Sequence, residues 1–202
     1  MVGGIDTTSV STEWVMVELL RNPVAMMKVQ EEVRNIAADK KRVDMNDICR
    51  MDYLKNVVKE TIRLHPPAPL IPRETTARAK IGPYEIPDKT RVFVNIWAIL
   101  RDPSVWDDPE EFIPERFERN PLEYFIGDDF QFIPFGFGRR KCPGIAFGSS
   151  SIEYVIANML YWFDWKYPEE SGSAKDMDMS VIYGLTLHKK FPLHAVPIQF
   201  IP

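Results

Sequence analysis

Residues 135–144 read FGFGRRKCPG and place one cysteine, Cys142, immediately before a long apolar segment. That segment, from Ile145 to Phe163, is predicted to be a helix, and Pro143 suits the first turn of one. A cysteine at a helix N-terminus beside cations is favoured as the thiolate, which is the form that binds metals. Two glycines in the run let the backbone turn tightly and approach a flat ligand. The run therefore marks Cys142 as a candidate metal ligand.

A plainer interpretation of a lone cysteine is a small buried hydrophobe, and Cys49 is predicted to be one. Glycine-rich basic loops are also common in proteins without cofactors. The three histidines, His65, His188 and His194, lack the spacing of a metal site. The loop around Cys142 alone therefore leaves both interpretations open.

Length, composition and charge restrict the class of protein. The chain has 202 residues, is 45% hydrophobic and carries a net charge of -4, which suits one domain with a sizeable core. The acidic balance argues against nucleic acid as a partner. The most apolar run, residues 92–100, is interrupted by Asn95 and is too short to span a membrane. Two cysteines far apart in sequence favour a reducing compartment over a disulfide framework.

Hydrophobic periodicity and the placement of Gly and Pro predict the order of elements. Helices are expected over residues 6–20, from Pro23 onward, and over 46–50, 52–65 and 145–163. Small strands are expected within 68–94, most clearly at 91–95, and again within 177–202. A brief helix over 95–100 and an irregular meander over 104–134 complete the order.

An E-x-x-R pair lies on the strongest predicted helix. Glu60 and Arg63 are three residues apart, so their side chains share a helix face and can pair. Such pairs are frequent on solvated helices, but the neighbours of this one are largely apolar. A buried pair needs further partners to offset its desolvation, and Arg116 in the P-E-R-F run is a candidate.

The first residues include the run GGIDTT, from Gly3 to Thr8. Two adjacent glycines weaken a helix by about 1 kcal/mol each. One interpretation is a helix start with Asp6 or Thr7 as its N-cap. The other is a deliberate weak point inside a longer helix, and the motifs further along the chain favour it.

Together these motifs resemble the cytochrome P-450 family. The pattern F-x-x-G-x-R-x-C-x-G is met by Phe135, Gly138, Arg140, Cys142 and Gly144, and it follows E-x-x-R and P-E-R-F in the family's order. The runs KETIRLHPPAPLIPRE and FIPFGFGRRKCPG look like plant microsomal members. The resemblance implies a mainly α fold with small β-sheets. It also implies that residues 1–202 are the C-terminal portion of one haem-thiolate monooxygenase domain, without its N-terminal anchor and early helices.

The resemblance also implies a role for each motif residue. Cys142 would ligate the iron of haem b, Arg140 and Arg73 would pair with its propionates, and Asp6 and Thr7 would relay protons. The remaining loop positions Phe135, Gly138 and Gly144 would shape the cofactor site. Glu60, Arg63 and Arg116 would form a structural cluster, and substrate contacts would come from Leu70, Ile71, Tyr183 and Leu185.

The function implied is insertion of one oxygen atom from O2 into a lipophilic small molecule, such as a terpenoid or a phenolic. Electrons would come from NADPH through NADPH-cytochrome P-450 reductase, with Arg139 and Lys141 on the surface that receives this partner. The full-length protein would lie at the endoplasmic reticulum membrane, on its cytosolic face. A haem-thiolate isomerase or dehydratase, which needs neither reductase nor O2, is one alternative, and the Asp6-Thr7 pair argues against it. Another alternative is a truncated, non-catalytic polypeptide, since these 202 residues alone are expected to hold no stable haem.

Overall fold

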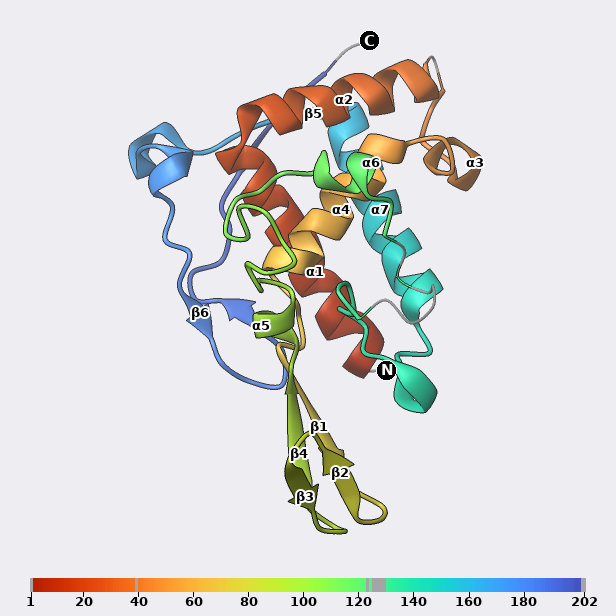
Figure 1. Cartoon of the computed structure of the whole chain (residues 1–202). Helices are drawn as coiled ribbons and strands as arrows, with labels where there is room; N and C mark the ends of the chain where they lie inside the picture. Colours follow the sequence, from red (N-terminus) through yellow and green to blue (C-terminus); the bar gives the residue numbers. More distant parts are fainter. Residues whose placement is uncertain (1, 39, 123, 125–129, 201–202) are drawn as a thin grey trace.

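The computed structural model describes residues 2–38, 40–122, 124 and 130–200. Met1, the inner part of the predicted meander and the last two residues of the predicted C-terminal strands lie outside these ranges. In the part that is described, four long helices form the body: α1 (Val2–Arg21), α2 (Pro23–Ala37), α4 (Asp52–Leu64) and α7 (Ile145–Trp162). They pack against one another, as Figure 1 shows. The predicted fold class, mainly α with small β-sheets, is confirmed.

The core lies between these four helices because each turns an apolar stripe inward. On α4, apolar residues recur every three or four positions, and all of them are buried. The buried side chains at the centre of the core are Val15, Leu19, Val29, Val33, Leu54, Val58, Ile152, Ile156 and Leu160. The N-terminus of α4 has no capping side chain of its own, so the Glu32 carboxylate on α2 accepts the N–H groups of Tyr53 and Leu54 at 2.9 and 2.8 Å. Burial raises the pKa of that Glu32 carboxyl.

The first helix begins earlier than the pattern predicts. Because α1 already includes Gly3 and Gly4, Asp6 and Thr7 lie within the helix and are not its N-caps. Asn22 and Pro23 then separate α1 from α2 as expected. The short helix α3 (Met45–Ile48) is stabilised by a capping box between Asp44 and Asp47.

The prediction that Cys49 is buried is wrong. Cys49 is exposed and follows α3 as its C-cap, while the preceding Ile48 is buried. One helical step rotates a side chain by about 100°. The step from Ile48 to Cys49 turns the Cys49 side chain out of the core.

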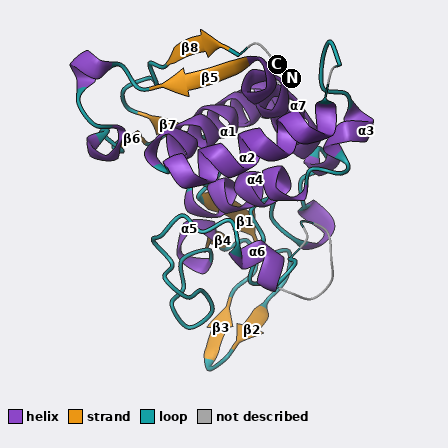
Figure 2. Ribbon diagram, turned by 90° about the horizontal axis from the view of Figure 1, so that it is seen from above, coloured by secondary structure: helices purple, strands orange, loops and turns teal. Residues whose placement is uncertain are grey.

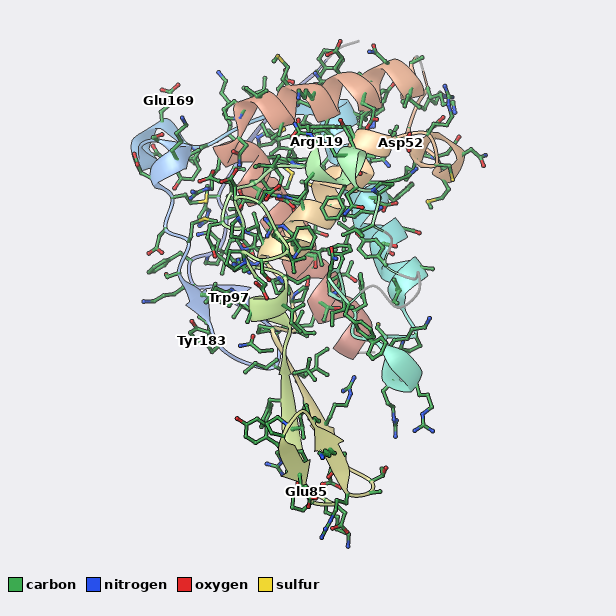
Figure 3. All side chains as sticks on the ribbon, in the orientation of Figure 1. Asp52, Glu85, Trp97, Arg119, Glu169 and Tyr183 are labelled. Atoms are coloured by element: carbon green, nitrogen blue, oxygen red, sulfur yellow. The ribbon has the colours of Figure 1, made fainter. Side chains whose placement is uncertain are left out.

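The proline-rich segment forms a projecting β arm. Strand β1 (Leu70–Glu74) pairs antiparallel with β4 (Arg91–Asn95), which confirms the strand predicted there. The hairpin of β2 (Ala79–Ile81) and β3 (Tyr84–Ile86) continues the arm away from the helices, with Glu85 at its tip (Figure 3). The short helix α5 (Ile96–Ile99) returns the chain to the body.

The meander and the cysteine loop contain only short helices in their described parts. These are α6 (Arg116–Arg119) and the 3-10 turn η1 (Gly138–Arg140). Every helix in the described ranges is too short or too polar to cross a bilayer.

The C-terminal region adds two small sheets beside the helices (Figure 2). Strand β5 (Phe163–Lys166) pairs with β8 (Val196–Gln199), and β6 (Val181–Ile182) pairs with β7 (His188–Lys189). Two 3-10 turns, η2 (Glu169–Ser171) and η3 (Ala174–Asp176), connect them. The sequence pattern missed β5, because its four residues, FDWK, follow directly on a helix and are too few to show a strand repeat.

A largely buried histidine joins α1 to α4. The His65 ring stacks on Trp14 with centroids 3.9 Å apart, and its Nε2 lies 2.6 Å from Glu18 Oε1. Burial lowers the pKa of His65 below its ordinary value of 6.5, despite the opposing effect of Glu18. The folded chain thus keeps this ring neutral at pH values where the unfolded chain protonates it.

Stability is therefore expected to fall as the pH drops below about 6.5, since the unfolded state then binds more protons. His65→Gln keeps a donor for Glu18 but removes the titrating ring, so the free energy of unfolding should decline less steeply between pH 7 and pH 5. Urea titrations at several pH values measure this slope. The matched variant His194→Gln, at an exposed position, should keep the wild-type slope. A slope that His65→Gln leaves unchanged would refute the assignment.

Candidate functional site

A cavity of about 530 Å³ lies between the start of α1 and the loop that precedes α7. Figure 1 shows these two segments side by side, although they are far apart in sequence. The cavity has the size of a ligand site. The residues that line it are Gly3, Gly4, Thr7, Thr8, Ser11, Ile62, Pro67, Ala68, Ile71, Arg73, Pro134, Phe135, Arg140, Cys142, Pro143, Gly144, Phe147, Gly148 and Ile152.

One wall of the cavity is formed by α1, and space remains beside it because α1 begins with glycines. A side chain added at Gly3 or Gly4 would meet nothing within 4 Å, so the cavity reaches the helix backbone itself. Thr7 lies one turn after Gly3, and its hydroxyl donates to the Gly3 carbonyl oxygen at 2.6 Å. Ser11, one turn further, makes the same kind of bond to Thr7, at 2.9 Å. These hydroxyls are therefore satisfied within the helix while they face the cavity.

The opposite wall is the cysteine loop. Its two ends are joined by a hydrogen bond from the Cys142 N–H to the Phe135 carbonyl, at 2.9 Å. Within it, Gly136 and Gly138 have φ angles of +71° and +70°, which side chains of L residues rarely adopt. The loop holds Cys142 half-buried, with the thiol on the cavity wall.

The two glycines of the loop differ in what surrounds them, and this difference makes a test. A methyl group at Gly136 would lie 3.2 Å from Ile71 Cδ1, whereas one at Gly138 would meet nothing within 4 Å. Gly138→Ala should therefore cost only the backbone strain, about 1–2 kcal/mol. Gly136→Ala should cost about 1 kcal/mol more, because it also crowds β1. Urea unfolding of both variants gives the two losses, and equal losses would contradict close packing of β1 on the loop.

Two arginines bring positive charge to the same cavity. Arg73 on β1 and Arg140 in η1 both line it, and Arg73 Nη2 donates to the Arg140 carbonyl at 3.3 Å. They meet because β1 runs alongside the loop: a methyl group at Gly136 would lie 3.7 Å from Arg73 Nη2. Guanidinium groups bind carboxylates in a planar, bidentate manner. Arg139 and Lys141 are exposed and lie outside the lining.

This set of side chains fits haem. One thiol suits an axial iron ligand, two guanidinium groups suit two propionates, and the largely apolar walls suit a macrocycle. Phe135 and Gly144 also line the cavity as predicted, whereas Gly138 shapes the loop from outside the lining.

The predicted structural cluster is assembled behind the cavity. Glu60 and Arg63 are fully buried, and their side chains form two bonds, of 2.8 and 2.9 Å. Arg116 Nε donates to the same Glu60 carboxylate at 2.9 Å. The Ile113 N–H adds a further bond of 2.9 Å. One carboxylate thus offsets two buried cations and holds the meander to α4.

The arginines of the cluster also fix the backbone of the meander. Arg63 donates to the carbonyls of Leu100, Pro109 and Glu111 at 2.7–3.1 Å. Arg116 donates to the Asp107 carbonyl at 2.8 Å. Because these carbonyls lie in a segment with little regular structure, the arginines provide donors that a helix or sheet would otherwise supply.

Asp6 is not part of the cavity wall. Its carboxylate accepts the hydroxyl of Thr186 in the segment between β6 and β7, and lies 3.4 Å from His188 Nε2. Thr7, the other predicted catalytic residue, does line the cavity. The structure therefore separates the two side chains of the Asp6-Thr7 pair.

Of the four predicted substrate residues, the cavity includes Ile71 alone. Leu70 is exposed on β1. Tyr183 and Leu185 lie in the segment between β6 and β7, and Tyr183 is at the outer edge of the molecule in Figure 3.

Sequence reasoning identified Thr7 and Gly144 but missed the wall residues Ser11, Gly148 and Ile152, which a helical repeat could have identified. Gly3, Thr7 and Ser11 are spaced by four, and so are Gly144, Gly148 and Ile152. Positions four apart share a helix face. The two stripes are therefore the faces that α1 and α7 turn toward the cavity.

Comparison with known proteins agrees with these features. The sequence model of the family Cytochrome P-450 matches residues 1–194. The chain is 56% identical, over its whole length, to phenylacetaldehyde oxime monooxygenase CYP71AN24 of Prunus mume, and covers 38% of that protein. It is 49% identical over 98% of its length to desmethylyatein synthase of Sinopodophyllum hexandrum, and covers 40% of it. The chain thus spans about two fifths of the length of these relatives.

Proposed function

Since the chain belongs to the cytochrome P-450 family, we propose that it carries the haem-binding part of a haem-thiolate monooxygenase. The observation that supports this most is the placement of the Cys142 thiol, Arg73 and Arg140 on one cavity whose other wall is the glycine- and threonine-bearing start of α1. The family-level assignment makes the protein an oxidoreductase with a haem cofactor, which we take to be haem b.

Haem, when bound, supplies the iron at which O2 is reduced and one oxygen atom is transferred to the substrate. Cys142 would hold it as the thiolate ligand, and the hydrogen bond that joins Cys142 to Phe135 fixes where the sulfur lies. Arg73 and Arg140 would bind its two carboxylates and so set its rotation in the cavity. The apolar side chains Ile62, Ile71 and Ile152 would exclude water.

Proton delivery is assigned to α1. The Thr7 hydroxyl faces the cavity and donates to the Gly3 carbonyl. It can donate its proton instead to a group bound in the cavity. We propose that the Asp6 carboxylate, one residue before Thr7, connects this hydroxyl with solvent. Thr7→Ala should therefore lower the product formed per NADPH consumed.

We propose a lipophilic small molecule as the substrate, a terpenoid, a phenolic or a related specialised metabolite. The largely apolar cavity supports this, and the names of two relatives indicate activity on phenylacetaldehyde oxime and formation of desmethylyatein. Electrons would come from NADPH through NADPH-cytochrome P-450 reductase, and the exposed Arg139 and Lys141 offer it a basic surface. We place the protein at the cytosolic face of the endoplasmic reticulum membrane, the location of the plant microsomal members that it resembles.

The test of this function uses the chain in two forms, alone and fused to the preceding sequence of the Prunus mume relative. Each form is reduced and exposed to carbon monoxide. A thiolate-type Soret band is expected from the fused form and no stable haem from the chain alone, and a histidine-type band from the fused form would overturn the assignment. Product formation is then measured with reductase, NADPH and phenylacetaldehyde oxime as the probe. Product that forms without reductase would instead favour the isomerase or dehydratase alternative.

A further inference from the structure

A second cavity, of about 470 Å³, lies in the C-terminal region of the chain. It is lined by residues around η2, by residues 177–178 and by residues 189–196, and it shares no residue with the haem-site cavity. In Figure 1 these blue segments lie on the other side of α1 from the cysteine loop. The volume is that of a small-molecule site.

The walls of this second cavity are apolar and are anchored to α1. Met177, one of the lining residues, is buried in a cluster with Val10, Trp14 and Val17 of α1. The lining residues Tyr167 and Leu193 pack against the same cluster, and Phe191 adds a further aromatic ring to the lining. The folded chain therefore forms the cavity by its own packing.

One charged side chain in the lining is buried. Lys189 is only 6% exposed, and its Nζ donates to the carbonyl of Asp178. A lysine this deeply buried is ordinarily paired with a carboxylate, but Lys189 forms no ion pair within the described residues. An ammonium has three N–H donors, so it can donate to further acceptors. The cavity thus combines apolar walls with a positive charge that lacks a counter-ion.

Two carboxylates act on Lys189 through their charge, but backbone N–H groups hold both of them. The Asp178 carboxylate accepts from the Ser180 N–H at 2.7 Å, and the Glu13 carboxylate on α1 accepts from the Leu193 N–H at 2.8 Å. Burial lowers the pKa of Lys189 despite the opposing effect of these two charges. An anion in direct contact with the ammonium would offset that cost of burial.

We propose that the second cavity binds a small molecule with an apolar body and one carboxylate. The carboxylate accepts a charge-assisted hydrogen bond from Lys189, and the apolar body is buried against Tyr167, Phe191 and Leu193. A neutral molecule of the same shape forgoes the ion pair, so the site selects its ligand by charge. The inference goes beyond the proposed monooxygenase function and does not depend on it, because the haem-site residues lie elsewhere.

The test compares two probes of nearly the same shape, 4-phenylbutyrate and its neutral amide, 4-phenylbutyramide. Their binding is measured by isothermal titration calorimetry to the chain fused to the preceding sequence of the Prunus mume relative. The acid is expected to bind at least about tenfold more tightly, because hydrogen bonds to charged groups contribute that factor or more. Equal affinities for the two probes would overturn the proposal. Binding by the chain alone that is lost in the fused form would also overturn it, since the preceding sequence would then fill the cavity.

A pair of lysine variants locates the bound carboxylate. Lys189→Met removes the charge at a similar side-chain volume, so it should weaken 4-phenylbutyrate by at least about tenfold and leave the amide within about threefold. The control Lys190→Met, at the next and exposed position outside the lining, should change neither affinity. A preference for the acid that survives Lys189→Met would refute the assignment, and it would place the carboxylate at another cation.

A measurement on the wild-type protein keeps the test independent of how well the variants fold. Reductive methylation of each lysine is followed by mass spectrometry with and without the probes. Saturating 4-phenylbutyrate should slow the labelling of Lys189 by at least about fivefold and leave that of Lys190 unchanged. Equal labelling of Lys189 with and without the acid would contradict the proposal. Neither measurement requires haem, so failure of the proposed function, seen in the carbon monoxide spectrum, is a separate result.

Discussion

Cys142→Ser is expected to remove the thiolate-type carbon monoxide spectrum and to reduce NADPH-dependent product formation by more than about 100-fold. Even groups that only support a metal ligand typically contribute about 10- to 100-fold, and the ligand itself contributes more. The sulfur is the metal-binding side chain among the residues that line the cavity. A serine hydroxyl does not replace it, since it is not ionised at neutral pH and donates far less electron density to iron.

The control for this variant is Cys49→Ser. Cys49 is exposed, directly follows α3 and is absent from the cavity wall. It should retain the wild-type spectrum and activity. A thiolate-type spectrum that survives Cys142→Ser, or that is lost in Cys49→Ser, would show that the wrong cysteine has been assigned.

Glu60→Gln is expected to destabilise the folded chain by about 3–5 kcal/mol, the cost of leaving buried charges without their counter-ion. The Glu60 carboxylate faces Arg63 and Arg116, which are 0% and 11% exposed. A neutral amide would leave both guanidinium groups without an ionic partner. The free energy of unfolding from urea titration measures the loss.

The same substitution at an exposed carboxylate is the control, because it removes the same charge from a side chain that is not buried. Glu110 also pairs with a largely buried arginine, Arg101, at 3.2 Å, but the Glu110 side chain itself is 67% exposed, so water can replace it beside the guanidinium. Glu110→Gln should therefore cost no more than about 1 kcal/mol. If Glu60→Gln yields too little folded protein, Arg116→Lys keeps the charge and loses the planar contacts, and it should still cost more than Glu110→Gln. Equal losses at positions 60, 110 and 116 would contradict a structural role for the cluster.

The Glu60-Arg63-Arg116 cluster shows how much of the structure local spacing in the sequence can predict. The positions of Glu60 and Arg63 on one helix face follow from the helical repeat, and the apolar neighbours indicate burial. The path of the meander does not follow in the same way, because its backbone is ordered by carbonyl bonds to Arg63 and Arg116. The bond from Arg63 to the Pro109 carbonyl joins residues 46 positions apart, so no local pattern encodes it.

Asp6 shows what local spacing in the sequence cannot predict. Its place in the GGIDTT run predicts a role beside Thr7, and both residues do lie on α1. Adjacent helix positions point about 100° apart, and the cavity wall includes Thr7 and Thr8 but not Asp6. Which of these residues face the cavity depends on the packing of α1 against α7 and against the β6–β7 segment, 180 residues further along the chain.

The exposed Cys49 and the missed strand β5 have the same origin. A residue type indicates a preference for burial, but the contacts of its element decide the outcome. Cys49 follows a four-residue helix that has a single face to bury. The pairing of β5 with β8 joins segments about 30 residues apart, and this pairing is what makes Phe163–Lys166 a strand.

The sequence by itself determined the helical stripes and the cysteine loop at the start of α7, because short-range spacing sets both, and its motifs resemble the family to which the chain belongs. Only the tertiary structure decided that Cys142, Arg73 and Arg140 share a cavity with Gly3 and Thr7, and that Asp6 is held outside it by Thr186. These relations join segments that are 60 to 180 residues apart in the numbering of the chain. They arise when apolar stripes from distant helices are buried together, and that burial is a property of the whole fold.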